Sequence, residues 1–157
     1  MTNLILGCGY LGRRVADLWL QQGQRVLAAT RNPETAQEFS RKGITPILCD
    51  VLHPEALRSL PPLDVVLYAV GFDRASGRSM REVYVEGLTR VMAVLPPAGR
   101  FIDVSSSSVY GQSDGEWVDE DSPTEPQEES GRVVRAAEAV LRQQQPQAMI
   151  LRFSGIY

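Results

Sequence analysis

A glycine-rich segment near the N-terminus has the spacing G-x-G-x-x-G and reads GCGYLG over residues 7–12. In such a loop Gly7 permits a tight turn, Gly9 lets the backbone approach a pyrophosphate, and Gly12 lets the next helix pack against the strand. A helix beginning at residue 10 would add free N–H groups and the positive end of its dipole. We therefore predict a dinucleotide-binding turn, with a glycine turn that holds no ligand as the alternative. The cofactor-binding candidates in it are Gly7, Gly9, Tyr10, Leu11 and Gly12.

The end of the next apolar run indicates which dinucleotide is bound. Residues 25–30 read RVLAAT, Arg31 follows, and the next acidic residue is Glu34. An acidic residue at this place binds the ribose 2′-hydroxyl of NAD, whereas an arginine suits the 2′-phosphate of NADP. Arg31 therefore favours NADP over NAD, with a solvated surface arginine as the alternative.

Two further strand ends are expected to border the same ligand. Asp50 follows the run 44–49 and is placed to lie beside the adenine. Residues 64–70 read DVVLYAV, a nearly continuous apolar run typical of a strand buried on both faces. Because ligands bind at the carboxyl ends of such strands, Ala69, Val70 and Gly71 complete the set of cofactor candidates.

Four consecutive serines at 105–108 follow another apolar run. At a strand's carboxyl end their hydroxyls would face the ligand crevice and could hydrogen-bond a substrate oxygen. Tyr84 and Tyr110 are phenols that could approach the same crevice and move a proton. The alternative for both is the packing role of an amphipathic aromatic side chain.

The rare residue types exclude several chemistries. The 157 residues include one histidine, His53, and one lysine, Lys42, with two cysteines at Cys8 and Cys49. A histidine-based triad therefore has a single candidate base, and a zinc site has at most three ligands of the Cys/His type. We predict no metal site, a capping or surface role for His53, and structural roles for both cysteines.

The formal charge of −3 is unevenly distributed. Segment 112–130 holds eight acidic residues and no lysine or arginine, which leaves an excess of basic residues elsewhere. That excess suits a phosphate-bearing ligand, while the acidic balance argues against nucleic acid. No apolar run approaches the roughly 18 residues that span a bilayer, and no signal peptide is evident. With two distant cysteines, these features predict a cytoplasmic protein without a membrane segment.

Short apolar runs alternate with amphipathic stretches along the chain, which predicts an α/β fold with a doubly wound parallel sheet, the Rossmann fold. We expect about six strands in the order 3-2-1-4-5-6 and one domain over 1–157. The strands are expected at 4–6, 25–30, 44–49, 64–70, 100–105 and 148–153, and the helices at 10–22, 33–42, 54–59, 79–95 and 131–145.

The segment VSSSSVYG at 104–111, together with the glycine turn and LRFSGIY at 151–157, resembles the short-chain dehydrogenase/reductase superfamily. The similarity covers essentially the whole chain and points to the extended or atypical branch, the NAD-dependent epimerases and dehydratases of nucleotide sugars. It implies that Ser106, four residues before Tyr110, polarises the substrate. It also implies a nucleotide sugar or related small molecule as substrate, a substrate-binding lobe absent from this chain, and a homodimer through the helices at 79–95 and 131–145.

The sequence departs from that family at its proton relay. The family motif Y-x-x-x-K falls on Ser130 and Val134, while the Glu that commonly follows is present as Glu138, and Tyr84 replaces a family Asn. Lys42 belongs to another helix, on the side opposite the crevice. One interpretation is an NAD(P)-dependent enzyme in which Tyr84 or Tyr110 substitutes as acid and base. The others are a non-catalytic dinucleotide-binding sensor or regulatory module and a purely structural domain.

Overall fold

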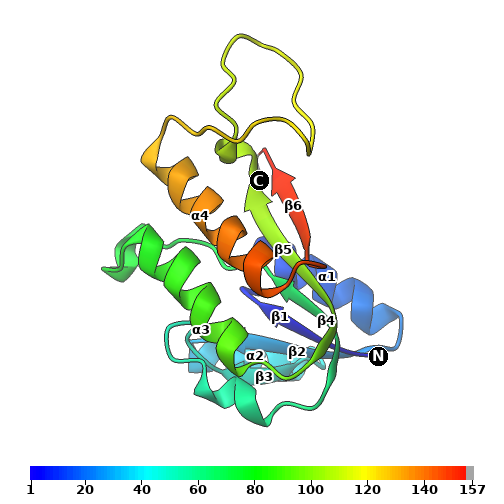
Figure 1. Cartoon of the computed structure of the whole chain (residues 1–157). Coiled ribbons are helices and arrows are strands. Elements are labelled where there is room, and N and C mark those ends of the chain that lie inside the picture. Colours follow the sequence, from blue (N-terminus) through cyan, green and yellow to red (C-terminus); the bar gives the residue numbers. More distant parts are fainter. Residues whose placement is uncertain (155–157) are drawn as a thin grey trace.

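The computed structural model describes residues 1–154, and these form a single parallel sheet with helices on both faces (Figure 1). The strand order is β3-β2-β1-β4-β5-β6, which confirms the predicted order and the Rossmann fold. The strands are β1 Thr2–Leu6, β2 Arg25–Thr30, β3 Thr45–Leu48, β4 Leu63–Tyr68, β5 Ala98–Ser106 and β6 Met149–Phe153. The α-helices are α1 Tyr10–Gln21, α2 Pro33–Arg41, α3 Gly87–Val94 and α4 Glu129–Gln144.

Two apolar layers hold the sheet between its helices. On one face Leu4 and Val66 pack with Leu88 and Val91 of α3 and with Leu141 of α4. Ile5, Val26 and Leu67 form the other layer with Ala16 of α1 and Phe39 of α2. Successive side chains of a strand point to opposite faces, so the continuous apolar runs of the central strands supply both layers.

Local signals in the sequence set the element ends. The Asn32 side chain caps α2 by accepting a hydrogen bond from the Glu34 N–H at 2.7 Å. Pro33 occupies the first turn, where its missing N–H costs nothing. Gly43 follows α2 with a φ of 81°, a left-handed conformation that favours glycine.

The helix expected at 79–95 differs from the prediction in its geometry. Residues Glu82–Glu86 (η3) form a π-helical segment that leads directly into α3. A Cβ on Gly87, where the two join, would lie 2.9 Å from the Val51 side chain, so the helix comes close to the loop after β3. Such π segments occur frequently at functional sites.

Three short 3-10 turns complete the fold: η1 Glu55–Ser59, η2 Arg74–Ser76 and η4 Ser107–Val109. The acidic loop between η4 and α4 extends beyond the carboxyl end of β5 (Figure 1, yellow). No helix within residues 1–154 is long and apolar enough to cross a membrane. The last three residues of the LRFSGIY motif lie outside the described residues.

Candidate functional site

A cavity of about 660 Å³ opens at the carboxyl ends of the central strands. Its wall runs from the glycine turn and the end of β2, past the ends of β4 and β5, to η3 and α4. The strand order reverses between β1 and β4, so the cavity lies at the switch point where doubly wound sheets bind ligands.

The glycine turn has the geometry that a bound pyrophosphate requires. Gly7 has a φ of 87°, and a Cβ there would collide with the Ala69 backbone. A Cβ on Gly12 would lie 2.8 Å from the Gly7 carbonyl oxygen, so only glycine lets α1 pack this close to the turn. A Cβ on Gly9 would meet nothing within 4 Å. Gly9 is the N-cap residue of α1, and because it has no side chain it makes no capping hydrogen bond to the first N–H groups of the helix. The first turn of α1 therefore offers N–H groups to an anion, and the residues fit a dinucleotide.

Nine of the ten predicted cofactor residues line this cavity, and Gly12 lies behind them as a packing residue. Arg31 is exposed and borders the cavity together with Thr30 and Thr35, and its guanidinium has no ion-pair or hydrogen-bond partner within residues 1–154. The nine are Gly7, Gly9, Tyr10, Leu11, Arg31, Asp50, Ala69, Val70 and Gly71.

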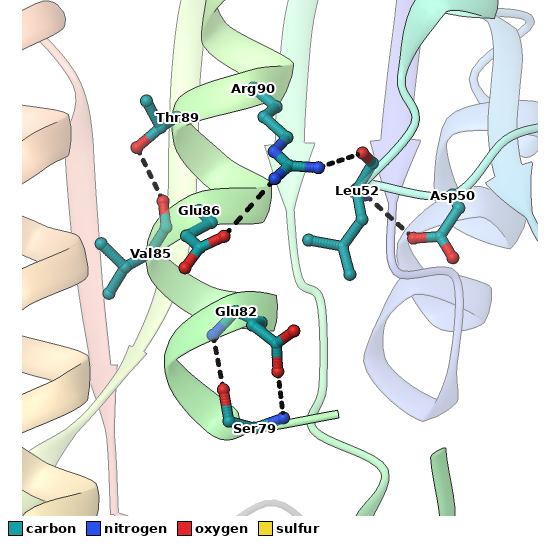
Figure 2. A network of polar contacts seen from close by, with 8 residues as sticks. All are labelled: Asp50, Leu52, Ser79, Glu82, Val85, Glu86, Thr89 and Arg90. Carbon is teal, nitrogen blue, oxygen red and sulfur yellow. Dashed lines mark hydrogen bonds and ion pairs between the residues drawn. The ribbon is translucent and has the colours of Figure 1, made fainter. Parts of the chain in front are cut away.

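A polar network holds the loop that carries Asp50 (Figure 2). The Asp50 carboxylate accepts a hydrogen bond from the Leu52 N–H at 2.9 Å. Arg90 of α3 donates to the Leu52 carbonyl at 2.8 Å and pairs with Glu86 at 3.5 Å. The cavity wall at Asp50 is thus fastened to the same helical unit that carries Tyr84.

Tyr84 lines the cavity from η3. The start of this helical unit is fixed by a reciprocal pair, in which the Ser79 N–H donates to Glu82 at 2.6 Å and the Glu82 N–H donates to Ser79 at 3.1 Å (Figure 2). The Tyr84 hydroxyl accepts a hydrogen bond from the Phe72 N–H at 3.1 Å. Burial raises the pKa of Tyr84, so its phenol stays protonated at neutral pH.

Ser105 and Ser106 of the serine cluster both border the cavity, and both also form hydrogen bonds within the fold. Ser105 borders the cavity, but its hydroxyl donates a hydrogen bond to Glu138 of α4 at 2.6 Å. Ser106 also lines the cavity, and its hydroxyl oxygen accepts from the Ser108 N–H at 3.1 Å, which caps η4. The Ser106 hydroxyl keeps its own proton available for a substrate oxygen.

Tyr110 lies away from the cavity lining among the described residues. Its hydroxyl donates to the Asp119 carbonyl at 2.7 Å and accepts from Arg152 at 2.9 Å. Tyr110 thus anchors the acidic loop, and the structure does not bring it together with Ser106 and Tyr84 at the cavity.

The cavity wall is apolar where the family places its lysine. Val134 lines the cavity and is only 9% exposed, with Ala137 beside it. Ser130, at the family tyrosine position, is exposed near the start of α4. Lys42 follows α2 and is not among the residues that border the cavity.

Two buried polar groups received no chemical role from the sequence: Asp103 was not singled out, and Glu138 was noted only as the glutamate that commonly follows the family motif. Asp103 of β5 lines the cavity and is 7% exposed, and burial, with a contribution from the Glu138 charge, raises its pKa to about 7. Glu138 forms a bidentate ion pair with Arg152 of β6, in which Arg152 Nη2 donates to Glu138 Oε2 at 2.8 Å and Arg152 Nε donates to Oε1 at 3.0 Å. The available signal was an acidic residue inside the apolar run FIDV.

The two cysteines border the cavity, and the histidine lies on the surface. Burial raises the pKa of both the Cys8 and Cys49 thiols to about 11, so each is a neutral thiol at physiological pH. His53 is exposed in the loop before η1. No group of three or more His, Cys, Asp or Glu side chains within residues 1–154 is arranged to hold a metal ion.

The strand order, the glycine turn and the cavity at the switch point define the Rossmann class of α/β proteins. Residues 3–157 match the sequence model of the NAD dependent epimerase/dehydratase family. The chain belongs to that family, within the short-chain dehydrogenase/reductase superfamily, which confirms the predicted resemblance.

Three similar proteins illustrate the relationship. One is a short-chain dehydrogenase/reductase superfamily protein from Agrobacterium tumefaciens, whose structure was solved with bound NAD. It has a TM-score of 0.80 and 27% sequence identity to this chain, and the match covers 98% of this chain and 49% of that protein. A protein from Methylobacillus flagellatus, described as an NAD-dependent epimerase/dehydratase, has a TM-score of 0.77 and 35% identity, over 99% of this chain and 55% of its own.

The third is the 4-hydroxy-2-methyl-3-oxo-4-farnesyl-3,4-dihydroquinoline-1-oxide ketoreductase of Stigmatella aurantiaca. It is 32% identical over an alignment of 125 residues, which covers 74% of this chain and 37% of that protein. The chain thus spans about half or less of the length of these relatives.

Proposed function

We propose that this chain forms the NADP-binding part of an enzyme of the epimerase/dehydratase type, acting on a hydroxyl or carbonyl group of a small molecule. The observation that carries the proposal is the continuous cavity, which joins the glycine turn at one end to Ser106 and Tyr84 at the other. This cavity would therefore hold the nucleotide and the substrate next to each other.

Several parts of the cavity would hold the nucleotide. The turn at Gly7 and Gly9 and the first N–H groups of α1 would bind the pyrophosphate. Arg31 would pair with the 2′-phosphate of NADP, since a guanidinium can donate two parallel hydrogen bonds to phosphate oxygens. Asp50 would border the adenosine, and the backbone of residues 69–71 would pass the ribose side. When bound, the nucleotide would supply hydride transfer to or from carbon.

The substrate class rests on a smaller set of groups. The Ser106 hydroxyl would donate to a carbonyl oxygen or accept from a hydroxyl. The related ketoreductase supports a carbonyl substrate, and a nucleotide sugar remains within the same class. The predicted homodimer through η3–α3 and α4 stays a prediction.

The second candidate function is a dinucleotide-binding sensor or regulatory module without hydride transfer. The apolar Val134 and the exposed Ser130 favour it, because neither can replace the family's lysine or tyrosine. Nucleotide-dependent turnover separates the two candidates, since a sensor binds the nucleotide without consuming it.

Fluorescence titration with NADPH and NADH tests the nucleotide proposal. We expect NADPH to bind more tightly, and Arg31→Gln to weaken NADPH by about 10- to 100-fold, the loss typical of a charge-assisted hydrogen bond. NADH affinity should stay unchanged. Arg58→Gln, on the exposed side of η1, removes the same charge elsewhere and serves as control. The absence of saturable binding by either nucleotide would refute the proposed function.

A further inference from the structure

The Asp103 carboxyl occupies a distinctive place in the cavity. Asp103 pairs in register with Tyr68 of the neighbouring strand, and both belong to the sheet face covered by α3 and α4. On the same face, Glu138 is satisfied by Ser105 and Arg152, whereas no side-chain hydrogen bond among residues 1–154 reaches the Asp103 carboxyl. Asp103 borders the cavity together with Ser105, so its carboxyl group can form a hydrogen bond with a ligand bound there.

The groups around Asp103 leave it without a cationic partner. From β4 and η3 it faces the phenols of Tyr68 and Tyr84, which are neutral because burial raises the pKa of both. From α4 it faces Glu138, whose charge is already paired with Arg152 of β6. Val134 contributes only apolar surface where the family has a lysine.

This environment keeps a proton on Asp103 up to neutral pH. Desolvation disfavours the carboxylate, and the nearby Glu138 charge adds to the effect, so the pKa rises to about 7. A group with a pKa near the working pH exists in both protonation states and is efficient at giving and taking protons.

We propose that Asp103 is the proton-exchanging residue of this cavity, giving its carboxyl proton to the carbonyl oxygen of a bound aldehyde or ketone and taking it back from the alcohol. The inference rests on the proposed function and deepens it, because it assigns the acid and base that Ser130 and Val134 do not provide. Tyr84 and Ser106 then hold the substrate oxygen rather than titrate.

The proton balance in the direction of reduction is complete. The O–H bond of the Asp103 carboxyl breaks, and the O–H bond of the product alcohol forms. The reduced nucleotide, when bound, would supply the hydride and its two electrons to the carbonyl carbon. The Asp103 carboxylate regains its proton from water once the product has left, and oxidation of the alcohol follows the reverse course.

Proton release on nucleotide binding tests this inference without relying on turnover. The nicotinamide ring of the oxidised nucleotide is positively charged, so near Asp103 it should favour the carboxylate and expel the proton. Calorimetry at pH 6.5 in buffers of different ionisation enthalpy should show release of roughly half a proton with NADP⁺, and less with NADPH. Asp103→Asn should abolish the difference, and Asp121→Asn, on the exposed loop, should retain it.

A second arm measures NADPH-dependent reduction of a panel of cyclic and aromatic ketones. Asp103→Asn should lower kcat by about 10²- to 10⁴-fold, the usual contribution of a general acid, with NADPH affinity within twofold of the unaltered chain. If no compound reacts, the proton release alone decides. Normal nucleotide binding with unchanged proton release in Asp103→Asn, or unchanged turnover, would overturn the inference alone. Loss of nucleotide binding by the unaltered chain would instead overturn the proposed function.

Discussion

Asp103 should make the stability of the fold depend on pH in an unusual direction. Its pKa is about 7 in the folded chain, against an ordinary value of 3.8 that applies when the chain is unfolded. Between these two values the folded chain binds one more proton than the unfolded chain. The stabilising contribution is therefore fully present below pH 3.8 and is lost as the pH rises through about 7. Most aspartates, whose pKa falls on folding, act in the opposite sense.

The size of the effect follows from the separation of the two pKa values. One pH unit corresponds to about 1.4 kcal/mol, so the separation amounts to on the order of 4 kcal/mol in the free energy of unfolding. Asp103→Asn has nearly the same shape and cannot ionise. Relative to this variant, the unaltered chain should lose on the order of 4 kcal/mol between pH 4 and pH 8.

Urea unfolding at a series of pH values measures this difference directly. The free energies of the unaltered chain and of Asp103→Asn should diverge as the pH rises, with the variant becoming the more stable of the two. Asp121→Asn should follow the unaltered chain throughout. A difference between the unaltered chain and Asp103→Asn that stays constant from pH 4 to pH 8 would show that Asp103 ionises normally, and the reasoning would be wrong.

Two further perturbations test the glycine turn and the buried pair. Gly12→Ala should destabilise the fold by about 1–3 kcal/mol, because its Cβ would lie 2.8 Å from the Gly7 carbonyl oxygen. Gly9→Ala has open space at that atom, so it should leave the melting temperature nearly unchanged while weakening NADPH binding; equal melting temperatures for the two variants would contradict this. Glu138→Gln should cost about 3 kcal/mol by removing the buried charge that pairs with the partly buried Arg152, and should lower the pKa of Asp103, measured by NMR titration of its carboxyl carbon. An unchanged carboxyl titration would mean that Glu138 does not act on Asp103.

The sheet order and the glycine turn were predictable because their signals are local. Each strand is a short apolar run, and the spacing of Gly7, Gly9 and Gly12 is contained in one short segment. The contact that requires glycine at position 7 comes from Ala69 of a distant segment, but the spacing alone is enough to predict the turn. The right-handed crossover rule then leaves few arrangements of six alternating strands and helices.

The buried polar groups were not predictable because their surroundings are assembled from distant segments. Asp103 and Glu138 are 35 positions apart, and the pair with Arg152 forms only once α4 packs on the sheet and β6 joins its edge. The place of Tyr110 depends on the path of the acidic loop, since its hydroxyl is held by the Asp119 carbonyl. The π segment around Tyr84 likewise follows no local pattern that separates it from an ordinary helix.

The hydrogen bond from the Phe72 N–H to the Tyr84 hydroxyl joins two segments that border the cavity, one before η2 in the chain and the other after it. An amide in a loop normally exchanges its hydrogen with solvent quickly, and protection from exchange measures how often the local structure opens. The hydrogen-exchange rate of the Phe72 amide therefore reports how often these two segments separate. A ligand that holds both of them would slow that single amide's exchange, even where it leaves the overall unfolding equilibrium unchanged.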